Sequence, residues 1–303
     1  MAAAASPLSS LLARGDAVLD GGFATELEAR GHDLRDSLWS ARVLCDDPQA
    51  IEDVHAAYFE AGADVAITSS YQATFEGFEA RGIDRAEAAR LLRLSVELAR
   101  RARERTGGRG LVAGSVGPYC VVWADGGEYT GDYAAATDDE IAATQRARIA
   151  ELVAAGADAI ALETIPNARE AVILAELLGE FPGVEAGLSL CCRDGEHLSD
   201  GSRIDDVVRA ASRRGPIAAF GVNCTPPRYV DSLLELARRA TDAPLLVYPN
   251  HGRAWDDATY TWSGIGVDRF PPELVARWRN LGARGIGGCC GIGPAAIAEL
   301  ARG

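Results

Sequence analysis

Short apolar stretches alternate along this chain with longer segments in which apolar residues recur every three or four positions. Stretches of the first kind, many with β-branched residues, predict buried strands, and segments of the second kind predict amphipathic helices. We expect strands at Ala17–Asp20, Asp64–Thr68, Gly110–Ser115, Asp158–Glu163, Val184–Leu190, Ile217–Val222, Pro244–Tyr248 and Arg284–Gly288. We expect helices at Pro48–Ala61, Arg85–Arg105, Asp138–Ala155, Ala168–Leu178, Ile204–Arg214, Arg228–Ala240 and Pro272–Leu281.

The order of these elements predicts an α/β fold. Eight strands separated by helices within 303 residues match a (β/α)8 TIM barrel, in which the catalytic site lies at the C-terminal ends of the strands. Gly62 and Gly156 precede two of the strands, where a helix C-cap is expected. An open doubly wound sheet is the alternative, but no Gly-x-Gly-x-x-Gly follows the first strand. Residues 1–303 are expected to form a single barrel domain.

Three cysteines stand at the expected ends of two strands. Cys224 ends an apolar run, and Cys289 and Cys290 lie between glycines in Gly287–Gly291. Neighbouring side chains on a regular strand point to opposite faces, but glycines let the backbone leave strand geometry and turn both sulfurs the same way. In a barrel all three sulfurs would face one mouth. Three thiolates suit zinc and leave a fourth position open, as in catalytic sites; a pair of buried free cysteines is the alternative.

A second adjacent pair, Cys191 and Cys192, also lies at a strand end. It lacks flanking glycines and begins a Cys-Arg-Asp-Gly turn, so one side chain should point into the barrel and the other away from it. We therefore do not expect this pair to bind the metal. Cys45 and Cys120 are expected to be structural.

Composition excludes several classes of partner and chemistry. The net charge of −14 disfavours nucleic acid and anionic membranes, because both would be repelled. The chain has no lysine, which excludes Schiff-base, pyridoxal-phosphate and P-loop chemistry. Seven cysteines, mostly isolated, do not indicate a disulfide framework. With no apparent secretion signal and no long apolar span, a cytoplasmic location without membrane contact is expected.

Two connections after strands are long and carry several aromatic residues, Gly117–Thr137 and Asn250–Phe270. On the catalytic face of a barrel such loops act as lids or substrate walls. Contacts between subunits would explain them equally well, so the oligomeric state stays open.

The chain resembles the homocysteine S-methyltransferases over nearly its whole length. The resemblance rests on an ordered set of motifs rather than on any single one. These motifs are Asp20–Glu28, Thr68–Thr74, Ser115–Tyr119, Leu162–Asn167, Leu198–Gly201, Gly221–Cys224, Tyr248–Asn250 and Gly287–Gly291. The details are most similar to the branch that uses S-methylmethionine, with S-adenosylmethionine as a poorer donor.

The resemblance implies a role for each matched residue. Cys224, Cys289 and Cys290 would be the ligands of Zn²⁺. The remaining residues would bind homocysteine, with Glu163 taking the ammonium group, and no catalytic side chain beyond the zinc site is implied. These substrate-binding residues are Asp20, Gly21, Gly22, Phe23, Glu163 and Asn223. One departure is Gly291-Ile292-Gly293, where the family commonly has an Arg-Thr-Thr-like run, so any substrate contact of that run is in question.

The implied reaction moves a methyl group from a sulfonium to the thiol of L-homocysteine and gives methionine. A thiol with a pKa near 8.5 is only slightly ionised at neutral pH, and zinc would keep it as thiolate. The leaving group is a neutral thioether, so no acid catalyst is needed. Betaine as donor, selenocysteine as acceptor, a zinc hydrolase and a non-catalytic zinc-stabilised barrel are the alternatives.

Overall fold

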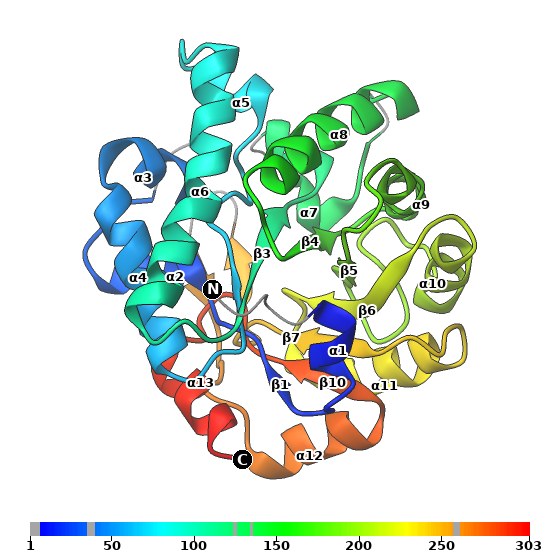
Figure 1. Ribbon diagram of the computed structural model, residues 1–303. Helices are drawn as coiled ribbons and strands as arrows, with labels where there is room; N and C mark the ends of the chain where they lie inside the picture. Colours follow the sequence, from blue (N-terminus) through cyan, green and yellow to red (C-terminus); the bar gives the residue numbers. More distant parts are fainter. Residues whose placement is uncertain (1–6, 35–39, 124–125, 134–135, 257–260) are drawn as a thin grey trace.

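The computed structural model describes residues 7–34, 40–123, 126–133, 136–256 and 261–303, and these form a (β/α)8 barrel (Figure 1). Eight parallel strands are hydrogen-bonded in the order β1-β10-β7-β6-β5-β4-β3-β2. A parallel bridge between Leu19 and Val65 joins the two outer strands and closes the barrel. The strands are β1 (Ala17–Val18), β2 (Val65–Ile67), β3 (Leu111–Val116), β4 (Ala159–Ile165), β5 (Ala186–Leu190), β6 (Ile217–Asn223), β7 (Leu245–Tyr248) and β10 (Ala283–Ile286). All eight predicted strands are therefore confirmed, with ends that differ by a few residues.

Helices surround the strands (Figure 1). They include α2 (Phe23–Ala29), α3 (Ser40–Asp46), α4 (Pro48–Glu60), α5 (Phe75–Glu79), α6 (Arg85–Arg105), α7 (Gly127–Thr130), α8 (Asp138–Ala154), α9 (Ala168–Leu177), α10 (Ile204–Ser212), α11 (Pro227–Arg238), α12 (Pro272–Asn280) and α13 (Pro294–Ala301). The seven predicted helices are all present. Of these, α8 begins with a capping box formed by Thr137 and Glu140, which satisfies backbone N–H groups that a helix leaves free. Gly62 and Gly156 follow α4 and α8 with φ values of +98° and +80°, as expected for C-cap glycines.

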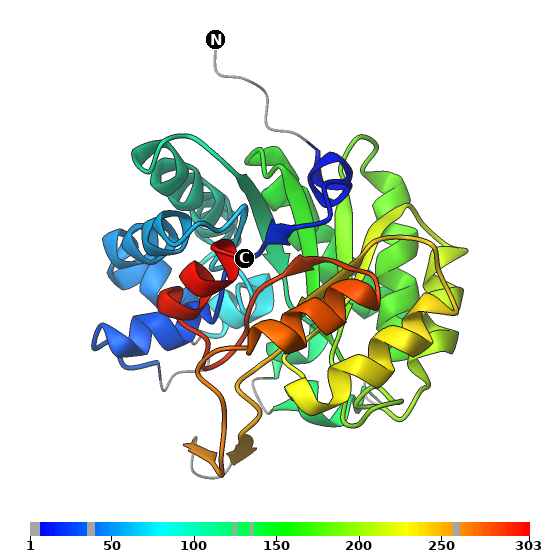
Figure 2. The same ribbon diagram turned by 90° about the horizontal axis from the view of Figure 1, so that it is seen from below.

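Two apolar layers hold the barrel together. The larger fills the space between the strands and the surrounding helices, and the smaller lies inside the barrel. The short helix α1 (Leu8–Leu12) contributes Leu8, Leu11 and Leu12 to the inner cluster, where they join barrel residues such as Leu246. Figure 2 shows α1 at one end of the barrel and the hairpin of β8 (Ala254–Asp256) and β9 (Thr261–Ser263) at the other. Helix α1 thus closes one end of the barrel, and the candidate site lies at the other end.

The sequence reading did not anticipate the short elements. The helices α1, α2, α3, α5, α7 and α13 and the β8–β9 hairpin are additions to the predicted set. Tyr260, one of the aromatic residues in the predicted long loop Asn250–Phe270, lies outside the described residues. In the described parts of the chain, no helix combines the length and apolarity needed to cross a bilayer.

Candidate active site

The barrel brings three cysteines together at the C-terminal ends of two strands. Cys224 directly follows β6, and Cys289 and Cys290 lie just beyond β10. The three Sγ atoms all lie within 4.8 Å of one another, and they form the one His/Cys/Asp/Glu group in the described residues that could hold a metal ion. Residues 65 positions apart in the sequence thus share one site.

The sulfurs are not equivalent. Cys224 and Cys289 are joined as a disulfide, with an S–S distance of 2.10 Å. The Sγ of Cys290 lies 3.9 Å from that of Cys224 and is a free thiol. Nothing in the sequence predicted this bond. Because a disulfide offers no thiolate, the cluster can bind a metal through three thiolates only when it is reduced.

Backbone contacts fix the two cysteine segments relative to each other. Cys224 has a φ of +46°, which is rare for a residue with a side chain. Asn250 Nδ2 donates to the Cys224 carbonyl at 3.0 Å, and Cys289 N donates to the Pro249 carbonyl at 2.9 Å. A Cβ on Gly22 would lie 2.6 Å from the Cys289 carbonyl oxygen, so the segment between β1 and α2 can approach the pair only because glycine stands there.

The two acidic residues predicted to bind substrate are both buried in the barrel mouth. Asp20 is 3% exposed and accepts a hydrogen bond from Ile67 N at 2.7 Å. Glu163 is 8% exposed and accepts a hydrogen bond from Ser115 Oγ. Burial raises the pKa of Glu163 to about 7 despite the Ser115 hydrogen bond and the charge of Arg148. Burial raises the pKa of Asp20 too, and the Glu163 charge adds to this.

Such carboxyl groups favour a cationic ligand. Among the described residues neither carboxylate forms a salt bridge, although both are removed from water. A buried charge without a counterion is costly, and an ammonium group placed between them would offset that cost and restore their ionised forms.

Asn223, also predicted to bind substrate, is fully buried and hydrogen-bonded to the end of β4, which is separated from β6 by β5. Its Oδ1 accepts from Thr164 N at 2.7 Å, and its Nδ2 donates to Thr164 Oγ1 at 2.7 Å. Thr164 itself has a φ of +59°. The Asn223 side chain therefore holds an unusual backbone conformation directly after Glu163.

A second buried polar network lies between α8, α9 and the segments that follow β2 and β3, and the sequence did not predict it. Glu170 Oε1 accepts from Tyr119 N at 2.8 Å, and Oε2 accepts from Tyr133 OH at 2.6 Å, so one carboxylate holds both ends of a long loop. Gln145 Nε2 donates to Glu170 at 2.5 Å and its Oε1 accepts from Arg148 at 3.0 Å.

Arg148 completes this network. Its guanidinium is fully buried and donates to the carbonyls of Ser70, Tyr71 and Gly117, which follow β2 and β3. Gln145 and Arg148 stand on the same helical stripe as the buried Ile141 and Leu152. Polar residues on an apolar stripe were the sequence signal for this network.

The other adjacent pair behaves as predicted from its lack of glycines. Cys192 belongs to the core between strands and helices. Cys191 points the other way, with its Sγ 3.9 Å from the Cys224 carbonyl oxygen. Both are buried free thiols, and neither belongs to the group that could hold a metal.

Fold and site together define a (β/α)8 barrel enzyme with three clustered cysteines and two buried carboxyl groups at the C-terminal ends of its strands. The model of the family "Homocysteine S-methyltransferase" matches residues 17–303. The chain is 46% identical to the homocysteine S-methyltransferase of Escherichia coli, with 97% of each chain covered. It is 45% identical to the homocysteine S-methyltransferase YbgG of Bacillus subtilis, covering 94% of this chain and 93% of that one. The chain belongs to the homocysteine S-methyltransferase family.

Solved structures agree with this placement. The metallated form of the homocysteine methyltransferase MmuM from Escherichia coli superimposes with a TM-score of 0.87 at 45% identity, covering 98% of this chain and 99% of that one. An oxidised form of the same enzyme superimposes equally well, with a TM-score of 0.87. The protein is thus a methyltransferase that uses homocysteine and a methyl donor, and its similarity to a metallated enzyme points to a metal.

Proposed function

We propose that the protein is a zinc-dependent enzyme that transfers a methyl group from a sulfonium to L-homocysteine, giving methionine. The preferred donor is S-methylmethionine, and S-adenosylmethionine serves less well. The observation that carries the proposal is the convergence of three cysteine sulfurs within 4.8 Å in the same barrel mouth as two buried carboxyl groups. We extend it to residues 1–303 as one homocysteine-binding domain working in the cytoplasm, where thiols stay reduced.

The donor set fits zinc. Sulfur ligands select soft or borderline cations, and three protein ligands leave one position for a substrate. Burial, followed by the charge of Glu128, raises the pKa of the Cys290 thiol to about 12, so a cation is needed to hold this sulfur as thiolate at neutral pH. Zinc bound by Cys224, Cys289 and Cys290 would supply the Lewis acidity that keeps the homocysteine sulfur ionised and nucleophilic.

The chain itself positions the amino-acid end of homocysteine. Glu163 and Asp20 would take its ammonium group as a charge-assisted pair. Its carboxylate would lie against the backbone of Gly21–Phe23, where Gly22 N already donates to the Ile292 carbonyl at 2.8 Å, so the Gly21 and Phe23 N–H groups are the proposed donors. Asn223 would act by holding Thr164, and through it the strand end that carries Glu163.

Methyl transfer between two sulfurs mainly requires alignment. The donor carries its positive charge from the start and leaves as a neutral thioether, so no side chain has to deliver a proton to it. An ionised homocysteine, held in place by two buried carboxylates, would be sufficient for this chemistry.

One assay tests the proposal. Reduced, zinc-loaded protein is given homocysteine and, in turn, S-methylmethionine, S-adenosylmethionine, glycine betaine and methylfolate, and methionine is measured. With S-methylmethionine both products are methionine, so the yield should approach two per donor consumed, and kcat/KM should be highest for this donor. Equal or better use of betaine would overturn the donor assignment, and turnover by fully zinc-free protein would overturn the role of the metal.

A further inference from the structure

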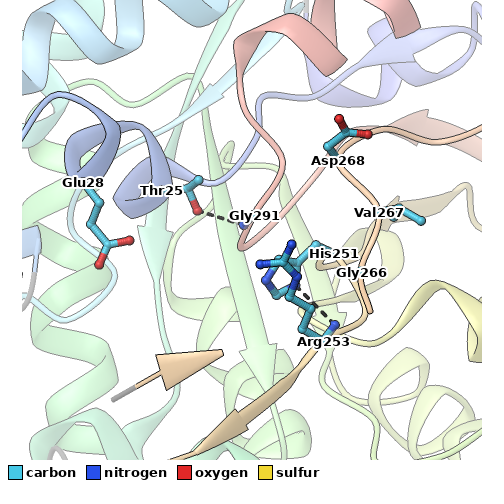
Figure 3. Close-up of a pocket in the computed structure, with 8 residues that line it drawn as sticks. All are labelled: Thr25, Glu28, His251, Arg253, Gly266, Val267, Asp268 and Gly291. Atoms are coloured by element: carbon cyan, nitrogen blue, oxygen red, sulfur yellow. Dashed lines mark hydrogen bonds between the residues drawn. The ribbon is translucent and has the colours of Figure 1, made fainter. Parts of the chain in front are cut away.

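A cavity of ≈530 Å³ opens beside the cysteine cluster, and Figure 3 shows the residues around it. One wall comes from α2, with Thr25 and Glu28, and another from the segment that follows β7, with His251 and Arg253. Gly291, the residue after Cys290, lies between them. The volume falls in the range of about 300–1,000 Å³ that small-molecule sites occupy.

The cavity is fixed to the cysteine pair by hydrogen bonds. Gly291 N donates to Thr25 Oγ1 at 2.8 Å, and His251 N donates to the Cys290 carbonyl at 2.9 Å. Gly291 has a φ of +83°, and a Cβ there would lie 2.2 Å from His251 Cδ2. A side chain at this position would clash with His251, so the close approach of the two segments beside Cys290 requires glycine.

The two walls carry opposite charges. Glu28 projects from α2 and Arg253 from the opposite wall, as Figure 3 shows. The third charged residue of the lining, Asp268, is paired with Arg269 at 3.3 Å. A ligand with an ammonium group and a carboxylate complements these two opposite charges.

This cavity is separate from the place proposed for homocysteine. Asp20 and Glu163 are buried and are not part of its lining, whereas Glu28 and Arg253 are exposed. Transfer of a methyl group from one amino acid to another requires both to be bound at once with their sulfurs in line. Two zwitterion sites beside one cysteine cluster meet that requirement.

We propose that this cavity docks the methyl donor and that the donor is an α-amino acid bearing a sulfonium. Its ammonium group faces Glu28, its carboxylate faces Arg253, and its sulfonium lies on the Cys290 side. The assignment rests on the proposed function and adds to it the residues that select the donor.

Steady-state kinetics of Glu28→Gln and Arg253→Gln test the docking site. The proposed ion pairs of the donor with Glu28 and Arg253 are exposed, so the loss of either should raise the KM of S-methylmethionine by about fivefold. The homocysteine KM and the zinc content should stay as in the unchanged protein. Glu79→Gln and Arg213→Gln, which remove exposed charges from α5 and the end of α10, are the matched controls and should change none of these values.

A donor without the amino-acid group sharpens the test. Trimethylsulfonium has the reactive centre alone, so its kcat/KM should be the same in both variants as in the unchanged protein. Unaltered KM values for S-methylmethionine in both variants, with turnover intact, would overturn the docking site and leave the function standing. Absence of turnover of every sulfonium by the unchanged, zinc-loaded protein would instead overturn the proposed function.

Discussion

The amide of Asn223 binds Thr164 twice, through Oδ1 to the backbone N–H and through Nδ2 to Oγ1, both at 2.7 Å. These bonds join the ends of β6 and β4, and they stabilise a backbone conformation at Thr164 that residues with a side chain rarely adopt. One side chain thereby links the residue before Cys224 to the residue after Glu163.

Replacing Asn223 by Ala should therefore affect stability and homocysteine binding together. Loss of the two buried bonds should lower the free energy of unfolding by about 1–3 kcal/mol. The homocysteine KM should rise, because the strand end that carries Glu163 is released, while zinc content stays near that of the unchanged protein. Denaturant unfolding and metal analysis check this. A KM that stays constant in a destabilised variant would show that Asn223 has a structural role only.

The metal site predicts which cysteines matter for zinc. Reduced protein should hold about one zinc per chain. Single Ala replacements of Cys224, Cys289 and Cys290 should each lose the metal and the activity, because two remaining thiolates cannot retain it. Cys191→Ala and Cys192→Ala are matched controls from a buried adjacent pair and should keep the zinc. Full zinc occupancy in Cys289→Ala, measured by atomic spectrometry, would contradict the ligand set.

The disulfide predicts a dependence on reductant. Oxidised protein should show five titratable thiols when denatured, because Cys224 and Cys289 are joined and the other five cysteines are free. It should take up little zinc. After reduction and removal of the reductant, all seven cysteines should titrate and zinc uptake should return. Stoichiometric zinc in the five-thiol form would show that the metal binds elsewhere.

Glu163 predicts a pH dependence of homocysteine binding. The pKa of this carboxyl group is about 7 without ligand, and only the ionised form attracts an ammonium group. The homocysteine KM should therefore fall as the pH rises through about 7. The free energy of unfolding changes with pH in the opposite direction. A raised native pKa favours the protonated native state, so the contribution of Glu163 to stability decreases between about pH 4.5 and 7.

Glu163→Gln isolates this effect. The variant should raise the homocysteine KM by about ten- to a hundredfold, as expected for a lost charge-assisted hydrogen bond of roughly 1.5–3 kcal/mol. It should also lose the pH dependence while keeping its zinc. Thiols without an amino group serve as the control, because Glu163 has nothing to pair with in them. Equal losses for both kinds of thiol would argue against an ammonium site.

The sequence predicted the barrel and the meeting of the three cysteines, because strand period, helix period and glycine position are local signals. It could not predict the disulfide, which depends on how close Cys224 and Cys289 come in space. It also missed the buried network around Glu170, since a charged residue on a helix looks the same in sequence whether its face meets solvent or a neighbouring loop. Arg148 and Gln145 stood on an apolar stripe, and that pattern was the available clue.

The same network gives a last prediction, for Tyr133→Phe. Tyr133 OH donates to Glu170 Oε2 at 2.6 Å, and the change leaves that buried oxygen without its donor. We expect the free energy of unfolding to fall by about 1–3 kcal/mol. Burial raises the pKa of Glu170 and the Tyr133 bond lowers it, so without the hydroxyl the pKa should rise further. Because only the ionised carboxylate gains from this bond, the loss should be larger at pH 8 than at pH 5.

Thermal unfolding at the two pH values measures this difference, and tryptophan fluorescence reports on the loop itself. Trp123 lies edge-on to Tyr133 with ring centroids 6.0 Å apart, so loosening of the loop should change its emission. Tyr229→Phe is the control, because its ring, which lies under the Arg228 guanidinium at 4.7 Å, is kept. A loss of stability that is the same at both pH values would mean that packing around Tyr133, and not its bond to the Glu170 carboxylate, holds the end of the loop.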